Sequence, residues 1–294
     1  MHSKADLHVH TKVSKVIPFR MSYFLRAVSR ARYLGHQGFA LTEHFHSIDY
    51  WQTMNWLALR FPYIEGRLSI FSDFNVLTGA ELTLADHADV TLIGPLESLA
   101  WLDKQFSPSL SEGQFPYLKD VIEPAHTAGL IIIGAHPTRP VKRLTDIDPE
   151  ILAKLDALEV SGKDMASHPA NEIVGQLASE LNLPVVGGSD AHLWAQVGVQ
   201  YTVIPHNELT FKNLKHSLLE NTTRTVTSAN VRKIVRSCEV KKRRFKAKMR
   251  ERQKRSQQQI AKQSAVELQL GLVPANAAAP HSTEKETATA RTRN

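Results

Sequence analysis

Cysteine is almost absent from this 294-residue sequence, and Cys238 is its single example. One cysteine cannot form a disulfide within the chain, which agrees with a reducing compartment, and we expect a cytoplasmic protein. Zinc sites built from several thiolates are excluded as well. A site for several metal ions would have to use histidine and carboxylate side chains instead.

Long apolar runs are also missing. No stretch is long enough to cross a bilayer, and the polar and charged first residues are unlike a secretory signal. Hydrophobic residues make up 42% of the chain and charged residues 22%, which is ordinary for a soluble globular protein. The length suits one large α/β domain or two small ones, and the pattern leaves the oligomeric state open.

Acidic residues are scarce in the last part of the chain. Residues 231–294 contain 17 Lys and Arg against 5 Asp and Glu, a formal charge of +12, whereas residues 1–230 contain 19 against 24, a charge of −5. We therefore predict separate segments: a folded domain over 1–229, a basic amphipathic helix over 230–265 and a disordered tail over 266–294.

The basic helix has a clear pattern. Its apolar residues follow one helical stripe, made of Val231, Ile234, Val235, Cys238, Phe245 and Met249. Lys and Arg fill most other positions as far as Arg255. Residues 231–255 are thus a candidate for binding nucleic acid or another anionic surface by charge, although a helix of this kind is often simply solvated.

The motifs of two other phosphate- or ester-handling classes are missing. Ser189 lies in GGSDAH, which is not a nucleophile-elbow pattern. The same glycines lack the lysine of a P-loop. Serine hydrolase chemistry and nucleoside triphosphate binding of the P-loop type therefore have little support.

Predicted strands and helices alternate along residues 1–229. The expected strands cover 5–10, 38–44, 75–82, 90–94, 130–136, 155–162, 183–192 and 199–204. The expected helices cover 21–34, 117–128, 170–181 and 209–219. This alternation predicts an α/β fold with a parallel sheet, open or closed into a barrel. Residues 45–72 and 95–116 fit the pattern poorly and are interpreted as insertions or long loops.

Histidine and carboxylate residues recur at the ends of these strands. They are His8, His10, Glu43, His44, Glu81, His136, Glu159, Asp190 and His192, with His87 and Asp89 just before the fourth strand. Chemistry in parallel α/β folds gathers at the carboxyl ends of the strands. Such a cluster without cysteine suits Mn, Zn or Fe, and two or three ions together can bind a phosphoryl group and generate hydroxide. Glu81 is the natural bridging carboxylate, because Gly79 and Ala80 leave room for a close approach.

Five motifs carry a resemblance to a known family. They are DLHVHT at 6–11, LTEH at 41–44, GAEL at 79–82, GAHP at 134–137 and GGSDAH at 187–192. In order and spacing they resemble the PHP (polymerase and histidinol phosphatase) family over about residues 4–226. The resemblance implies a distorted (β/α)7 barrel with a di- or trinuclear metal centre at the strand ends, and hydrolysis of phosphoesters. Histidinol phosphate is one candidate substrate among several.

The resemblance also implies a set of metal ligands: His8, His10, His44, Glu81, Asp89, His136, Asp190 and His192. Carried over from the family, the first ion would be held by His8, His10, Glu81 and Asp190. Glu81 would bridge to a second ion with His136 as a further ligand, and His44 and His192 would help to hold a third.

Two positions depart from the family pattern. After the first motif the family often has a His or Asp for the third ion, whereas this chain has Ser14, Lys15 and their neighbours. Either a lysine ammonium occupies that corner or the third ion binds weakly. At the fourth strand the family often has a histidine, where this chain has Asp89 and, two residues earlier, His87. We favour Asp89.

The roles of the remaining residues follow from position and chemistry. Asp190 or His192 would handle the proton, and the Arg139 guanidinium would clamp a substrate phosphate unless it forms a salt bridge. Glu43 is expected to support a ligand from behind. For Glu159 we favour solvation of a strand end over orientation of a ligand.

The leading hypothesis is a metal-dependent phosphoesterase that hydrolyses a phosphomonoester of a small molecule or nucleotide with a metal-activated water. A nuclease or repair phosphoesterase that grips nucleic acid with its basic tail is the alternative. A binding module with a partly lost centre is a third reading. An amidohydrolase-type barrel is less suitable, because those proteins usually need a lysine where this chain has Glu81.

Overall fold

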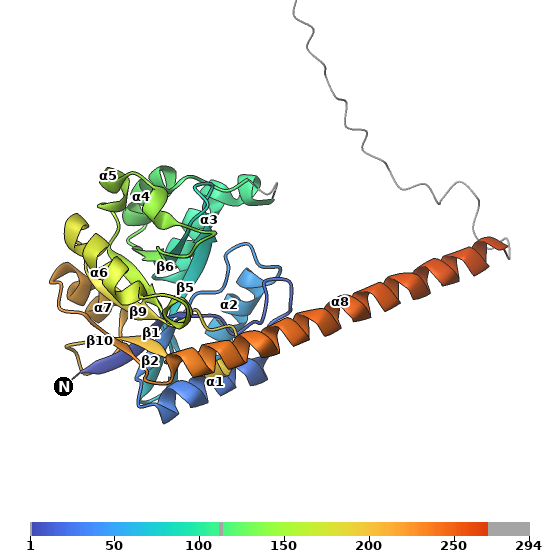
Figure 1. Ribbon diagram of the computed structural model, residues 1–294, viewed down its shortest axis with the longest axis horizontal. Coiled ribbons are helices and arrows are strands. Elements are labelled where there is room, and N and C mark those ends of the chain that lie inside the picture. Colours follow the sequence, from blue (N-terminus) through green and yellow to red (C-terminus); the bar gives the residue numbers. More distant parts are fainter. Residues whose placement is uncertain (1, 112–113, 270–294) are drawn as a thin grey trace, which may run out of the picture. The chain divides into compact units, whose positions relative to one another are not determined.

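The computed structural model describes residues 2–111 and 114–269 (Figure 1). The strands are β1 (Ser3–Val9), β2 (Gly38–Leu41), β3 (Tyr63–Ile64), β4 (Arg67–Phe71), β5 (Phe74–Thr83), β6 (Asp89–Ile93), β7 (Ile131–Ala135), β8 (Ala157–Ser161), β9 (Val185–Gly188), β10 (Gln200–Ile204) and β11 (Arg224–Thr227). The α-helices are α1 (Met21–Tyr33), α2 (Tyr50–Arg60), α3 (Leu96–Ser111), α4 (Leu118–Thr127), α5 (Pro149–Leu152), α6 (Ala170–Leu181), α7 (Phe211–Leu219) and α8 (Val231–Gln269). Short 3₁₀ turns are η1 (Leu144–Asp146), η2 (Asp164–Ala166) and η3 (Trp194–Gln196).

The strands form one sheet that is nearly closed into a barrel. Its hydrogen-bonded order is β11-β10-β1-β2-β5-β6-β7-β8-β9, with β4 beside β5 and β3 beside β4. Just beyond β9, Ala191 pairs in parallel with Val9 at the end of β1. The His10 amide also donates to the Ala191 carbonyl at 2.8 Å. The last strands therefore meet the first, which confirms the predicted distorted barrel.

The strand directions are mixed rather than all parallel. The pairs β1–β2, β2–β5, β7–β8 and β8–β9 are parallel, but β6 runs antiparallel to both β5 and β7. The connection between β5 and β6, residues 84–88, is too short for the crossover that a parallel neighbour needs. As a result Asp89, the first residue of β6, pairs with Thr83 at the carboxyl end of β5.

Apolar residues explain why these elements pack. Helix α1 buries Phe24, Ala27, Val28 and Ala31, which recur at helical spacing. Figure 1 shows the helices of the body around the outside of the sheet. Inside the barrel a second apolar cluster gathers small and branched side chains: Ala5, Leu7, Ala40, Leu77, Ile93, Ile131, Ile133, Ala157, Val186 and Ile204, with Leu209, Leu214 and Leu218 from and beside α7. This cluster fills the interior, so polar residues of the same strands collect at the barrel's edge.

Two regions that the sequence pattern left as insertions contain regular structure. Residues 45–72 include α2, β3 and β4, and residues 95–116 include α3. The β3–β4 hairpin pairs with the outer edge of β5, where Leu68 faces Val76. Long loops were therefore the wrong interpretation of both regions.

Helix α8 begins the basic part of the chain. Val231 and Val235 are buried together with Val199, and Cys238 is buried too, so the first turns use the predicted apolar stripe.

The chain divides into a body over Met1–Lys242 and a second unit over Arg243–Asn294. In the second unit the described residues are helical as far as Gln269, and most of the predicted tail, 270–294, lies outside the described residues. No described helix has both the length and the apolar character that a membrane crossing requires.

Candidate metal centre

The predicted ligands converge on one edge of the barrel. The edge is formed by the carboxyl ends of β1, β2, β5, β7 and β9 and by the first residue of β6. Its members are His8, His10, His44, Glu81, Asp89, His136, Asp190 and His192. All are buried except His44, whose side chain is 20% exposed. Residues from opposite ends of the domain thus meet in one place.

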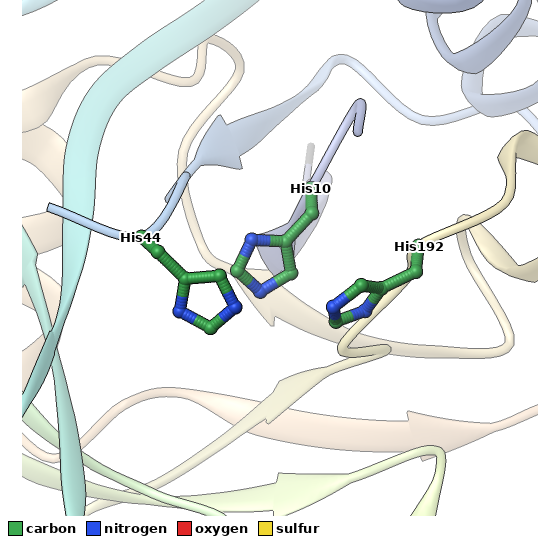
Figure 2. A group of neighbouring side chains, drawn as sticks. All are labelled: His10, His44 and His192. Atoms are coloured by element: carbon green, nitrogen blue, oxygen red, sulfur yellow. The ribbon is translucent and has the colours of Figure 1, made fainter. Parts of the chain in front are cut away.

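Three groups of three ligand-type residues overlap in this edge. They are His8, His10 and Glu81; Glu81, Asp89 and His136; and His10, His44 and His192. Within each group the ligand atoms lie within 4.8 Å of one another. Figure 2 shows the third group, with three imidazole rings approaching one another from separate strand ends. Glu81 links the first two groups, and His10 links the first with the third.

Glu81 lies at the middle of the cluster. Its Oε1 is 3.0 Å from His136 Nε2 and 3.7 Å from His8 Nε2. Its Oε2 is 2.8 Å from His44 Nδ1 and 3.4 Å from His10 Nε2. Burial opposes ionisation of this carboxyl, but the surrounding imidazoles, His44 foremost, outweigh it and hold its pKa well below the usual range.

The glycines near the cluster serve backbone packing. A Cβ at Gly79 would lie 2.6 Å from the carbonyl oxygen of Leu92 on β6, so this glycine allows close pairing of strands rather than room around Glu81. A Cβ at Gly188 would lie 2.5 Å from both His8 Cβ and Glu159 Oε1. Gly188 therefore lets β9 approach β1 at the ligand edge.

The donor set fits divalent cations. His44 Nδ1 and Glu81 Oε2 face each other while buried, and neither has a hydrogen-bond partner among the described residues. Buried polar atoms without partners are costly, and a shared cation would satisfy both. Burial and the neighbouring His44 lower the pKa of His10 well below its usual value. A neutral His10 imidazole beside the anionic Glu81 carboxylate is the protonation state that binds Mn, Zn or Fe.

Glu159 positions His8 and His136. The favoured interpretation, that Glu159 only solvates the end of a strand, is therefore wrong. It is 2% exposed. Its Oε2 lies 3.0 Å from His8 Nδ1 and accepts the His136 amide at 2.9 Å. Burial disfavours protonation of His8, but Glu159 and Glu81 outweigh it and raise the His8 pKa well above its usual value. The pairing of β8 with β7 and β9 aims this side chain into the ligand edge.

Glu43 lies behind His10, as expected. One oxygen accepts the amide of Thr11 at 2.7 Å and its hydroxyl at 2.9 Å. The other lies 3.7 Å from His10 Nδ1. Burial raises the pKa of Glu43 above its usual value, against opposing contributions that include Lys12. The carboxyl thus braces the first motif.

Arg139 holds two carboxylates. Its Nε and one terminal nitrogen donate to Asp164 Oδ1 at 3.1 Å, and the same terminal nitrogen is 2.8 Å from Asp190 Oδ2. The Arg139 guanidinium was predicted to bind a substrate phosphate unless it formed a salt bridge. In the structure it forms salt bridges with Asp164 and Asp190. Burial opposes ionisation of Asp190, but Lys163 and Arg139 outweigh it and lower its pKa well below the usual range.

Sequence reasoning missed two lysines at the rim. Lys163 Nζ is 3.3 Å from Asp190 Oδ2, and Lys142 Nζ contacts Asp89 Oδ1. Their side chains are 27% and 32% exposed, so both lysines join a buried carboxylate to the protein surface. Both residues follow strands that end at this edge, β8 and β7, and that position is the signal that could have identified them.

The two departures from the family pattern have structural outcomes. Asp89 is buried with Oδ2 3.6 Å from His136 Nε2, whereas His87 is exposed in a turn with φ of 55°. The geometry agrees with the preference for Asp89. At the other corner, Lys15 Nζ lies 2.7 Å from His46 Nε2, and the ring of His46 is 5.7 Å from that of His44.

Two ligand positions carry backbone strain. His136 has φ of 35° and Asp190 has φ of 50°, in the left-handed region that residues other than glycine seldom adopt. Such conformations persist where the surrounding structure holds them, and they cluster at functional sites. Their presence at two ligands supports a functional role for this edge.

Known proteins share this fold. Residues 168–223 match the PHP_C family model, described as PHP-associated. PsfC from Pseudomonas syringae PB-5123 superimposes with a TM-score of 0.69 at 24% identity, covering 83% of this chain and 99% of that one. The lesion-specific endonuclease PfuEndoQ from Pyrococcus furiosus gives 0.58 at 18% identity, covering 74% of this chain and 56% of that one.

Endonuclease Q in complex with a 27-mer duplex substrate, with an abasic lesion at the active site, gives a TM-score of 0.54 at 17% identity, covering 75% of this chain and 57% of that one. None of the curated proteins matches the sequence. The solved structures share the barrel, and the matched family segment contains α6, β9 and the last motif, GGSDAH. The resemblance of this chain to the PHP family, predicted from its five motifs, is confirmed by the PHP-associated match over residues 168–223.

Proposed function

We propose that this protein is a metal-dependent phosphoesterase that hydrolyses a phosphomonoester of a small molecule or nucleotide. One observation carries the proposal: three overlapping sets of largely buried His and carboxylate residues, joined through Glu81 and His10, lie together at one edge of the barrel, and two partly exposed lysines contact them. The ligand set suits two or three ions. Divalent ions bound there would polarise the phosphoryl oxygens, acidify a water molecule and offset charge on the leaving oxygen.

The rim cations would bind the substrate phosphate. Lys142 and Lys163 combine a contact to a ligand carboxylate with partial exposure, so each can reach toward an anion that arrives from solvent. Arg139 is better placed as a positioning residue, because its guanidinium holds Asp190 in place. Electrostatic attraction by two lysines favours a dianionic phosphoryl group over a neutral substrate.

Asp190 and His192 are the candidates for handling the proton. Their side chains are 3.2 Å apart, between Asp190 Oδ1 and His192 Nδ1. Burial and the neighbouring His10 lower the pKa of His192 to about 3, so the imidazole is neutral at pH 7. At so low a pKa the imidazole would hold a proton only transiently, so the Asp190–His192 pair would pass a proton on rather than store it. The domain over 1–229 would carry this chemistry, and the helix over 230–265 would serve a partner.

The test is metal-dependent release of phosphate. The full chain is stripped of metal, reloaded with Mn, Zn or Fe, and assayed on a panel of phosphomonoesters that includes histidinol phosphate. We expect turnover only with metal, and loss of turnover in Asp190→Asn. Asp120→Asn, an exposed aspartate on α4, is the matched control and should retain activity. Turnover without metal, or undiminished turnover in Asp190→Asn, would contradict the proposal.

A nuclease is the second candidate, and the basic helix is the observation that favours it. Thirteen of the residues from 231 to 255 are Lys or Arg and two are Glu. Oligonucleotides with and without terminal phosphates therefore belong in the same panel. Internal cleavage would select the nuclease, whereas removal of a terminal phosphate alone would select the phosphomonoesterase. Metal retained without turnover of any substrate would favour a binding module over both.

A further inference from the structure

A groove lies between the first turns of α8 and residues of α1 and η3. Its volume is about 440 Å³, and its lining comes from α1, η3 and α8. Arg30, Trp194, Lys233 and Lys241 are among the lining residues, and Ile234 and Cys238 contribute apolar surface. All of them belong to the body, Met1–Lys242.

The chemistry of this groove points to an anion with a planar apolar part. The indole of Trp194 is 39% exposed, although it stands on a turn fixed in the body. Three cations line the groove, and no carboxylate is among its lining residues. The Nε atom of Arg30 is buried and makes no hydrogen bond to any described residue. An exposed aromatic face among unneutralised cations suits a base joined to phosphates.

The groove is coupled to the metal centre through a short turn. Trp194 follows His192 by two residues, and the amides of His192 and Leu193 both donate to Gln196 Oε1, at 3.1 and 3.0 Å. The turn that carries the indole is therefore braced onto a ligand residue.

Beyond the groove the helix keeps the same charge. Between residues 243 and 255 there are eight Lys and Arg and one acid, Glu251, and all eight basic side chains are exposed. They occupy nearly every side of the helix, and apolar residues in this stretch are few: Phe245, Ala247 and Met249. A helix that lies on a membrane needs a broad apolar face. Cations on many sides instead suit a flexible polyanion that can wrap around them.

We propose that the groove binds a nucleotide of single-stranded nucleic acid, with a base on Trp194 and the flanking phosphates on Arg30, Lys233 and Lys241. The strand would then continue toward the metal centre, which would receive a phosphoester of the same strand. A single strand is favoured over a duplex because the base must be unstacked to reach the indole. The inference rests on the proposed function for the reaction, but the binding step needs no metal.

Binding can be measured without catalysis. The full chain in EDTA is titrated into a fluorescein-labelled single-stranded oligonucleotide, and fluorescence anisotropy reports the affinity. Trp194→Ala should weaken binding about tenfold, the loss expected for one stacked base. Trp101→Ala is the matched control, because Trp101 lies on α3, is 43% exposed and does not line the groove. Equal binding by Trp194→Ala and the wild type would overturn the assignment of the base.

The cations are tested by salt dependence. The Lys233→Gln, Lys241→Gln double variant should lower the slope of log affinity against log salt by about 1.4, which is two phosphate contacts on a single strand. Lys212→Gln is the control, because Lys212 is exposed on α7, at the opposite end of the barrel from the ligands. The location follows from Leu209, just before α7, whose carbonyl accepts a hydrogen bond from Asn75 near the start of β5. An unchanged slope in the double variant would overturn the phosphate contacts.

Two further outcomes would overturn the proposal as a whole. One is a duplex that binds as tightly as the single strand and is insensitive to Trp194→Ala. The other is binding to phosphatidylglycerol vesicles with no binding to oligonucleotides. Failure of the proposed function looks different: the wild-type protein would bind the strand in EDTA but hydrolyse no phosphoester when loaded with metal.

Discussion

The metal centre and helix α8 differ in where their charged side chains lie. At the centre, charged groups are buried against partners: Glu81 lies among four imidazoles, and Asp190 contacts both Arg139 and Lys163. On α8 the basic side chains from 243 to 255 are exposed, and an ion pair joins Arg255 to Glu251. One region fixes charge in place, whereas the other presents it to solvent.

This difference indicates two kinds of recognition. Buried and mutually fixed groups hold ligand atoms to a defined geometry, which chemistry at a phosphorus atom requires. Exposed cations on a helix attract any polyanion over a distance and are screened by salt. Under the proposed function the molecule would combine a precise centre with an unspecific attraction for the polyanion that brings the substrate.

Glu81→Gln should have the largest effect. The substitution removes the charge shared by two of the three ligand groups and leaves imidazoles facing a neutral amide. Since bound ions contribute several kcal/mol to transition-state stabilisation, we expect metal-dependent phosphate release to fall by about 1000-fold or more. Metal content by mass spectrometry should fall with it. Glu172→Gln is the control, because Glu172 is exposed in the first turn of α6.

If Glu81→Gln kept full metal content and activity, the carboxylate would not join the ligand groups. The contrast between a fixed centre and a diffuse helix would then lose its main support. A variant that keeps its metal but loses activity would instead assign Glu81 to the reaction rather than to metal binding.

A buried histidine outside the centre gives the second prediction. His36 is 4% exposed, and burial, with Lys4 and Arg30, lowers its pKa from 6.5 to about 4. Between these values the unfolded chain binds a proton that the folded chain does not. Its contribution to stability is therefore present above pH 6.5 and is lost as pH falls through about 4, by up to about 3 kcal/mol.

Urea unfolding of the metal-free protein at several pH values measures this loss. His36→Gln cannot titrate, so the difference between wild type and variant should shrink as the pH falls from 6.5 to 4. A constant difference over that range would show that burial of His36 is not what makes the fold sensitive to acid. The acid sensitivity of the fold would then have to come from other groups, such as the histidines of the metal centre.

Glu159→Gln should have a moderate effect. The amide carries no charge, and its NH2 group replaces one of the two carboxylate oxygens that lie 3.0 and 3.1 Å from His8 Nδ1, so it holds the imidazole less firmly. Removing a partner of this kind typically costs 10- to 100-fold in metal affinity. A metal titration followed by phosphate release should show a raised metal requirement, with turnover largely restored at saturating metal. Unchanged metal affinity would reduce Glu159 to a structural role.

The ligands were within reach of sequence reasoning because strand periodicity is local. His8 at the end of β1 and His10 just beyond it were expected on one side of the chain from their spacing alone, and the other ligands fall where a strand starts or stops. Asp89 was preferred over His87 by a family offset, and the burial of Asp89 follows from the hairpin of β5 and β6. That hairpin also explains why the sheet is mixed, which alternation of strands and helices alone does not reveal.

The supporting residues depended on long-range register. Glu159 reaches His8 only because β8 and β1 are brought together by the closing barrel, a contact over 151 positions of sequence. Lys142 and Lys163 sit in irregular segments, where no periodicity indicates which way a side chain points. Helices α2 and α3 were missed because aromatic, proline and serine residues in these regions suggested loops. In α2 the helical spacing of the buried residues Tyr50, Met54 and Leu57 was therefore overlooked.

The smallest effect is expected on α8. Lys248 is exposed, and Gln has a similar helix propensity, so Lys248→Gln should change the free energy of unfolding by less than about 0.5 kcal/mol. Its effect should appear in binding alone: the salt slope for a single-stranded oligonucleotide should fall by about 0.7, one phosphate contact. Anisotropy titrations at several salt concentrations measure this slope.

A loss of stability comparable to that of a core substitution would mean that this part of α8 is packed rather than presented to solvent, and the contrast with the centre would fail. A small, salt-dependent loss would sharpen it, because only exposed and mutually independent charges weaken binding one contact at a time.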